Sequence, residues 1–283
     1  MPRSSAQDIQ IKTPEQIELM RRAGLVVAAA LNAMRAATAP GVSTGDLDAI
    51  AEQVIRDHGA VPSFKGYHGF PASICASVNE QVVHGIPSAS QVLREGDLLS
   101  LDCGAILDGW HGDSAITIGV GETDPALLRM AEVAEDAMWA GIAAAARGAA
   151  NGRGRLTDIS FNVEKTVRKA AARYGIVDGY GGHGIGTEMH QDPHVLNHGK
   201  PGKGPRLVPG MCLAIEPMIT MGSPRTQELS DGWTVVTRDG SMAAHVEHTM
   251  ALLEDGVWVT TAPDGGRARL GELVTARQPA LAE

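Results

Sequence analysis

An approximate internal repeat constrains the fold of this chain more than any other sequence feature. "EGDLLSLD" at 95–102 aligns with "PGMCLAIE" at 209–216, and in both segments a glycine precedes the final acid, Asp102 or Glu216, by six positions. A single pair of such segments, each starting with glycine and ending in an acid, can arise by chance. Further matches in the same order would favour an internal duplication.

Two further pairs of segments do occur in that order. His84 and His190 each open a His-x-x-Pro tetrapeptide, and "DSAIT" from Asp113 can be set against "EHTMA" from Glu247. We therefore predict two related halves around a pseudo-two-fold axis. Such an axis would bring four carboxylates together, those of Asp102, Asp113, Glu216 and Glu247.

Helix and strand signals follow the same duplicated order. Thr13, Pro14 and Gln16 form an N-cap, a first-turn proline and a capping box, which predict a helix that continues to Pro40. The remaining elements are expected as helices at 44–58, 125–147 and 157–173, strands at 72–78, 97–104 and 113–120, and a hairpin within 222–241. We expect an N-terminal extension at 1–12, one domain at 13–261 with halves at 13–121 and 122–261, and a C-terminal tail at 262–283.

Composition excludes several classes of protein. A net charge of −9 and a pI near 5.6 argue against a nucleic-acid or anionic-membrane surface. The most apolar segment, 23–34, is too short to span a bilayer, and the N-terminus lacks the apolar run of a signal peptide. Three scattered cysteines and no CxxC predict neither a disulfide framework nor a thiolate zinc site. We expect a monomer of the cytoplasm, with no membrane and no specificity for nucleic acid.

The acids at the strand ends indicate metal chemistry. Asp102 ends an apolar run, where burial is costly unless the carboxylate is paired or metal-bound. Asp113 follows eleven residues later across a turn, so two antiparallel strands would place both acids side by side. Two close carboxylates repel unless a cation lies between them. Four carboxylates match two divalent ions, and one histidine as nitrogen donor favours Mn, Fe, Co or Zn.

Several motifs closely resemble those of the type I methionine aminopeptidases. "YGGHGIGTEMHQDPHVLNH" resembles the signature segment of that family, and "SLDCGAILDGWHGDSAIT", "LAIEPM" and "VEHT" resemble its other ligand segments, in the right order. The resemblance runs from about Thr13 to Val259 and is to the bacterial form. It implies a pita-bread fold of the α/β (α+β) class: duplicated helix-helix-strand halves around a central antiparallel sheet with pseudo-two-fold symmetry.

The resemblance also implies a set of site residues. The metal ligands for two divalent ions (Co, Mn, Fe or Zn) would be Asp102, Asp113, His183, Glu216 and Glu247, with Asp113 and Glu247 bridging. The substrate pocket would comprise Tyr67, Phe70, Cys75, His84, His190 and Trp233. Glu216, His84 and His190 would act in catalysis, while His194 and His198 are expected in a loop or at the surface. The chain departs from the family pattern at Phe64, Met189, Gln191 and Val246.

The implied activity is removal of the N-terminal methionine from nascent proteins and peptides, with small second residues preferred. A metal-bound hydroxide would attack, Glu216 would carry its proton, His190 would donate to the oxyanion and His84 to the substrate amide. A transient contact with the ribosome is a further expectation. The alternatives are an Xaa-Pro aminopeptidase or prolidase, a mononuclear hydrolase, and a pita-bread binding module without catalysis. The 33 residues from His183 to Glu216 leave no room for the insertion of the type II proteins.

Overall fold

A computed structural model describes residues 9–276. Its helices are α1 Pro14–Ala37, α2 Thr44–Asp57, α3 Pro125–Ala150, α4 Leu156–Lys169 and α5 Arg267–Leu270, with single 3-10 turns η1 Tyr67–Gly69 and η2 Gly271–Leu273. The first eight strands are β1 Val61–Pro62, β2 Ile74–Val78, β3 Gln81–Val83, β4 Leu98–Leu107, β5 Trp110–Gly119, β6 Gly175–Ile176, β7 Gly182–Gly184 and β8 Gln191–Val195. The others are β9 Cys212–Ile215, β10 Met218–Thr220, β11 Thr226–Glu228, β12 Val235–Thr237, β13 Ala243–His245, β14 Glu247–Leu253 and β15 Gly256–Val259.

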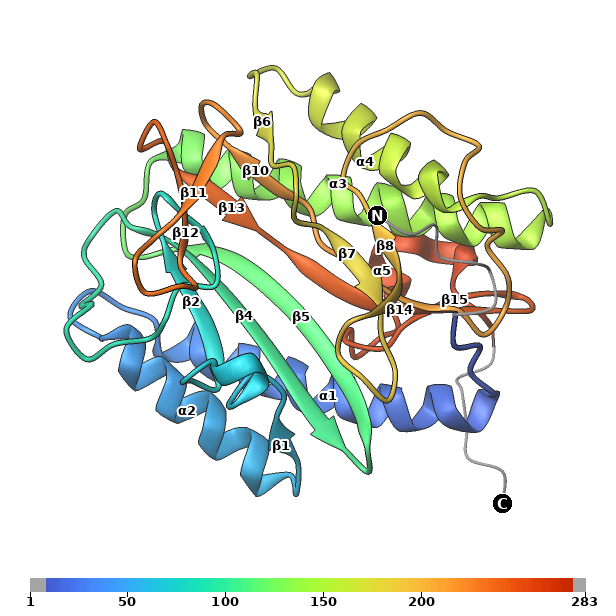
Figure 1. The fold of residues 1–283 in the computed structure, drawn as a ribbon, viewed down its shortest axis with the longest axis horizontal. Coiled ribbons are helices and arrows are strands. Elements are labelled where there is room, and N and C mark those ends of the chain that lie inside the picture. The colour runs from blue at the N-terminus through green and yellow to red at the C-terminus, as the bar shows by residue number, and fades with distance from the viewer. Residues whose placement is uncertain (1–8, 277–283) are drawn as a thin grey trace.

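Six strands form two three-stranded sheets, β13-β10-β6 and β11-β12-β3, and the other nine described strands form one large antiparallel sheet with the two halves meeting at its centre. Its order is β1-β4-β5-β14-β9-β7-β8, with β2 also paired to β4 and β15 also paired to β14. Helices α1 and α2 lie along the β4–β5 side and α3 and α4 along the other (Figure 1). The central neighbours β5 and β14 therefore come from different halves of the chain. This arrangement confirms the predicted fold class.

Each half packs its own pair of helices on the sheet. One apolar cluster joins α1 and α2 to β2 and β4, and a larger one joins α3 and α4 to β9, β14 and β15. The first helix begins as predicted, because the Gln16 N–H donates to Thr13 Oγ1 at 3.3 Å and the Thr13 N–H donates to Gln16 Oε1 at 3.0 Å. The predicted hairpin at 222–241 is also present, as β11 paired with β12, and β12 pairs on its other edge with β3.

The expected N-terminal extension and C-terminal tail both contain residues that pack on the domain. Lys12 is buried, and its backbone N–H donates to Gly210 O at 2.8 Å. Beyond 261, the side chains of Ala262, Leu270 and Val274 are buried in the larger core. Lys12 and parts of 262–276 are therefore held by contacts with the rest of the domain. Residues 1–8 and 277–283 lie outside the described part.

Two expectations from composition can be compared with the structure. Cys75, Cys103 and Cys212 are free and buried. None of the helices in residues 9–276 combines the length and the apolar composition needed to cross a membrane.

Candidate metal centre and substrate pocket

The register of the central strands gathers the acids of both halves. Ala115 on β5 lies opposite Asp102 on β4 and also opposite Glu247 on β14, while Asp113 lies opposite Gly104. Because alternate residues of a strand face the same side, Asp113 shares that face with Ala115. Asp102 and Asp113 are thus diagonal neighbours on adjacent strands, and Glu247 joins them from the other half. Glu216 follows directly after β9.

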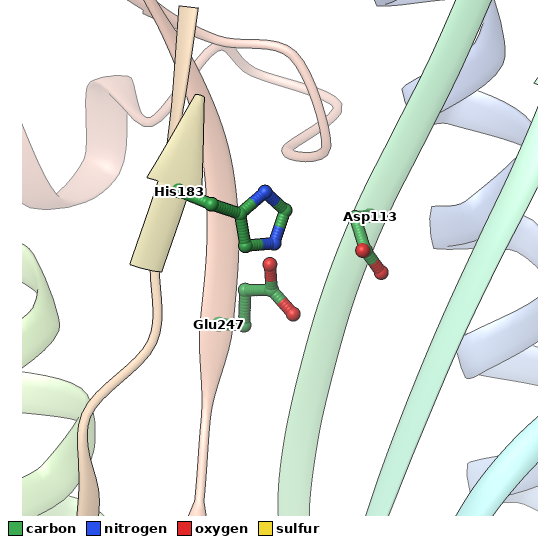
Figure 2. A group of neighbouring side chains, drawn as sticks. All are labelled: Asp113, His183 and Glu247. Atoms are coloured by element: carbon green, nitrogen blue, oxygen red, sulfur yellow. The ribbon is translucent and has the colours of Figure 1, made fainter. Parts of the chain in front are cut away.

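Side chains from three strands converge on one point of this face. Possible ligand atoms of Asp113, His183 and Glu247 all lie within 4.8 Å of one another, and Figure 2 shows the three side chains projecting from β5, β7 and β14 into the shared space. A second group with the same spacing comprises Glu216, His245 and Glu247. Within residues 9–276, Asp102 belongs to neither group, but it lines one cavity together with Asp113, His183, Glu216 and Glu247.

Three of the carboxylates have buried oxygens that lack a partner. Within residues 9–276, Asp102 Oδ1, Asp113 Oδ1 and Glu247 Oε1 make no hydrogen bond. Burial raises the pKa of Asp102 to about 7, and burial with the charges of neighbouring carboxylates raises the pKa values of Asp113 and Glu247 well above the usual range. Such a cluster is costly without a compensating charge. Divalent cations fit this donor set, since they would satisfy the oxygens and stabilise the ionised carboxylates.

The orientation of His183 suits a metal ligand. Its Nδ1 lies 3.0 Å from the carbonyl oxygen of Gly184. Because a carbonyl can only accept, Nδ1 carries the proton and Nε2 keeps a lone pair. That Nε2 lies 3.6 Å from Glu216 Oε1. A backbone partner on one ring nitrogen thus leaves the other available to a cation.

His245 is a site residue that the sequence analysis missed. It is fully buried, and its Nε2 lies 3.3 Å from Glu216 Oε2. Burial alone would lower the pKa of His245, but the close contact with the Glu216 carboxylate and the charge of Asp102 outweigh burial and raise it. Burial opposes ionisation of Glu216 too, yet His245 and His183 together lower its pKa. The available signal was a histidine two residues before Glu247 in "HVEHT".

The acids lie in the lining of a cavity of about 600 Å³, and every residue predicted for the substrate pocket also lines this cavity. Phe70 and Trp233 meet edge to face, with ring centroids 5.1 Å apart. Phe64 and Met189, two of the departures from the family pattern, join Phe70 and Cys75 in one buried apolar cluster. The cavity is therefore apolar at one end and acidic at the other.

Two histidines occupy the boundary between these ends. His190 Nδ1 lies 2.9 Å from the Tyr67 hydroxyl, and its ring packs edge to face on His183 with centroids 4.4 Å apart. Burial, with the nearby His183, lowers the pKa of His190 to about 4, so the ring is neutral at neutral pH. His84 follows β3 in a left-handed conformation, with φ 60°, and burial lowers its pKa as well.

The other residues singled out from the sequence have separate environments. Gln191 lines the cavity and accepts a hydrogen bond from Lys12 Nζ at 3.2 Å. His194 is exposed on β8 at the edge of the cavity, while His198 bonds to Asp178 at 3.1 Å outside it. Val246 is buried in the larger core and does not line this cavity.

The duplicated fold, with clustered buried carboxylates and an imidazole below an apolar pocket, defines a metal-dependent hydrolase. The family model for metallopeptidase family M24 matches residues 18–260. The chain is 56% identical over 250 residues to "Methionine aminopeptidase 1" of Mycobacterium tuberculosis (strain CDC 1551 / Oshkosh), covering 87% of this chain and 92% of that protein. It is 46% identical over 250 residues to "Methionine aminopeptidase 1" of Bacillus subtilis (strain 168), covering 88% and 98%.

Solved structures agree with these matches. A methionine aminopeptidase from Thermotoga maritima superposes with a TM-score of 0.84 at 40% identity, covering 89% of this chain and 99% of that one. A prolidase from Pyrococcus furiosus reaches 0.70 at 21% identity, covering 89% of this chain and 65% of that one, which shows a shared fold alone. The chain therefore belongs to metallopeptidase family M24 and, within it, to the methionine aminopeptidases. The resemblance read from the motifs is confirmed.

Proposed function

We propose that this protein removes the N-terminal methionine from peptides and nascent proteins, at a centre of divalent cations held by its acidic cluster. The observation that carries the proposal is the set of unpartnered oxygens on carboxylates that line the same cavity as an apolar cluster. The proposed ligands are Asp102, Asp113, His183, Glu216 and Glu247. Four carboxylates balance two divalent ions, and the single imidazole among them favours Mn, Fe, Co or Zn.

The bound ions would supply Lewis acidity and lower the pKa of a nucleophilic water. Glu216 is the group placed to move a proton from that water to the leaving nitrogen, because it lies at the centre beside His245 and has a lowered pKa. The scissile carbonyl needs a hydrogen-bond donor as negative charge develops on its oxygen. We assign this role to His190.

The contact with Tyr67 supports the assignment of His190. The Tyr67 hydroxyl lies 2.9 Å from His190 Nδ1. We assign the donor role in this bond to the phenol, which leaves the proton of the neutral ring on Nε2. An Nε2–H in this cavity can donate to an oxyanion without a change of charge on the ring. His84, which lines the cavity beside Trp233 and Tyr180, is assigned to the substrate amide.

The apolar end of the cavity suits a methionine side chain. Phe70, Trp233 and Cys75 offer aromatic edges and a polarizable sulfur to a thioether. We propose that these residues, with Tyr67, His84 and His190, hold the first residue of the substrate, and that a small second residue is preferred. Because such a substrate arises during translation, we further propose that the protein acts as a monomer in the cytoplasm and contacts ribosomes transiently.

An assay on reconstituted protein tests the proposal. Metal-stripped protein would be loaded with Mn, Co, Fe or Zn and given Met-Ala-Ser, Leu-Ala-Ser and Ala-Pro peptides. We expect metal-dependent release of methionine, with Leu-Ala-Ser and the proline peptides cleaved far more slowly. Cleavage of the proline peptides without methionine release would support the Xaa-Pro alternative. No hydrolysis with any metal would support a binding module.

A further inference from the structure

The join between the two halves lies directly at the proposed bridging acids. Asp113 is on β5 of the first half and Glu247 on β14 of the second, next to each other at the centre of the sheet (Figure 1). Strands β4 and β5, within one half, are paired at ten positions. Strands β5 and β14 are paired at only two, Ala115 with Glu247 and Ser114 with His248. The backbone ladder is therefore short where the spacing of two proposed ligands must be set.

Two buried hydroxyls extend this short ladder. Ser114 Oγ donates to the carbonyl oxygen of Glu247 at 2.6 Å, and Thr249 Oγ1 donates to the carbonyl oxygen of Asp113 at 2.8 Å. Both side chains are fully buried. The bonds are reciprocal, because each half supplies a hydroxyl to the residue that carries the other half's bridging carboxylate.

A third hydroxyl continues the same join away from the acids. Thr117 Oγ1 on β5 donates to His245 O at 2.6 Å and accepts the His245 N–H at 3.0 Å. Ser100 lies 2.9 Å from Thr117 Oγ1, and with the Thr117 hydrogen used on His245 it is Ser100 that donates. We call Ser100, Ser114, Thr117 and Thr249 the hydroxyl seam. Side chains there make the cross-strand bonds that a backbone ladder would otherwise make.

The seam acts on the part of the protein where strand spacing matters most. The carboxylates of Asp113 and Glu247 project from adjacent strands into one shared space (Figure 2), so their separation follows the separation of the strands. A change in the separation of β5 and β14 would therefore change the separation of these two proposed ligands. Buried hydroxyl-to-carbonyl bonds resist this because breaking one leaves an unsatisfied carbonyl.

We propose that Ser114 and Thr249 are positioning residues that fix the spacing of Asp113 and Glu247 and so keep the centre ready for divalent cations. This inference rests on the ligand set given under the proposed function. Neither Ser114 nor Thr249 lines the cavity. Groups that orient ligands in this way typically change metal affinity by about 10- to 100-fold when removed.

The test is calorimetric titration of Mn²⁺ into metal-free protein for S114A, T249V and the double variant. Thr237→Val is a matched control, because Thr237 is 3% exposed and its hydroxyl donates to Ser241 O at 2.7 Å within one half. We expect roughly 10-fold weaker Mn²⁺ binding for each single variant and a larger loss for the double variant. T237V should bind as the unchanged protein does, and T249S should restore most of the affinity lost in T249V.

A further variant distinguishes failure of the positioning role from failure of the proposed ligand set. Asp113→Asn is measured alongside, and unchanged affinity in D113N would reject the ligand set itself. If D113N binds Mn²⁺ more weakly but S114A, T249V and T237V all bind it as tightly as the unchanged protein, the ligand set stands. The positioning role of Ser114 and Thr249 is then rejected. Denaturant unfolding of the metal-free variants gives the stability effect separately, because a merely structural role lowers the unfolding midpoint and leaves the affinity of the folded protein unchanged. If T249V does not fold, S114A decides the matter.

Discussion

His183 presents Nε2 to Oε1 of Glu216 at 3.6 Å, while its Nδ1 donates to the carbonyl of Gly184 at 3.0 Å. The histidine is on β7 and the glutamate follows β9, two neighbouring strands of the same half. A free imidazole lone pair beside a buried carboxylate is the geometry that a divalent cation needs.

Replacing His183 should remove the nitrogen ligand and cause a large loss of function. We expect His183→Ala to lower kcat/KM by at least about 100-fold and to weaken divalent-metal binding. His198→Ala is the control, because His198 bonds to Asp178 outside the cavity. Metal titration and steady-state kinetics measure both effects. Equal metal affinity in H183A and H198A would contradict the role of His183.

Tyr67 and His190 should affect catalysis to different degrees. His190→Ala removes the proposed oxyanion donor, so we expect kcat to fall by about 100-fold or more. Tyr67→Phe keeps the ring but removes the hydroxyl that lies 2.9 Å from His190 Nδ1, and we expect a loss of about 10-fold in kcat with little change in KM. Steady-state kinetics on Met-Ala-Ser would check both values. Full kcat in H190A would exclude the oxyanion role.

Gly24 should resist substitution although it lies within a helix. In an ordinary helix, Gly→Ala stabilises by about 1 kcal/mol. Here a Cβ on Gly24 would overlap the carbonyl oxygen of Thr260 and lie 2.7 Å from its carbonyl carbon. We expect Gly24→Ala to reduce the free energy of unfolding by about 1–3 kcal/mol, because the backbone of the next segment must move. Denaturant unfolding measures the change, and a stabilised G24A would contradict the close packing.

Glu52 should contribute stability that depends on pH. Hydrogen bonds from Lys65 Nζ at 2.7 Å, from Arg56 and from Ser73 lower the pKa of Glu52 to about 2, against the opposing effect of burial. A folded-state pKa below the ordinary value of 4.5 means that the contribution is full above pH 4.5. It is then lost as pH falls toward 2.

Comparison of E52Q with the unchanged chain isolates this effect. We expect E52Q to lower the free energy of unfolding of the metal-free protein at pH 7, and the difference to shrink as pH falls from 4.5 toward 2. Glu132→Gln is the control, because the Glu132 side chain is 62% exposed in its pair with Arg129 and contributes little. A difference between E52Q and the unchanged chain that stays constant from pH 7 to pH 2 would contradict the account.

Several features of the fold and the site could be predicted because they depend on sequence patterns. The capping box at Thr13 sets the start of α1 because it involves residues only three apart. The hairpin that brings Asp102 near Asp113 follows from two apolar runs and the turn between them. The halves could be anticipated because the same order of acids occurs twice.

The features that could not be predicted depend on contacts between distant segments. His245 reaches Glu216 only because β13 and β10 pair, and no local pattern marks that pairing. The orientation of His183 depends on a backbone carbonyl, which every residue possesses. The seam hydroxyls are ordinary strand residues until β14 is placed beside β5. Long-range register, rather than residue type, supplies this information.

Anomalous diffraction from crystals of Mn²⁺-reconstituted protein tests the central claim most directly. We expect two anomalous peaks within the acidic cavity, with the carboxylates of Asp113 and Glu247 shared by the two ions. Asp102 would bind one ion, and His183 with Glu216 the other. A site without anomalous density there, or ions held by other side chains, would contradict the ligand set from which the proposed activity is argued.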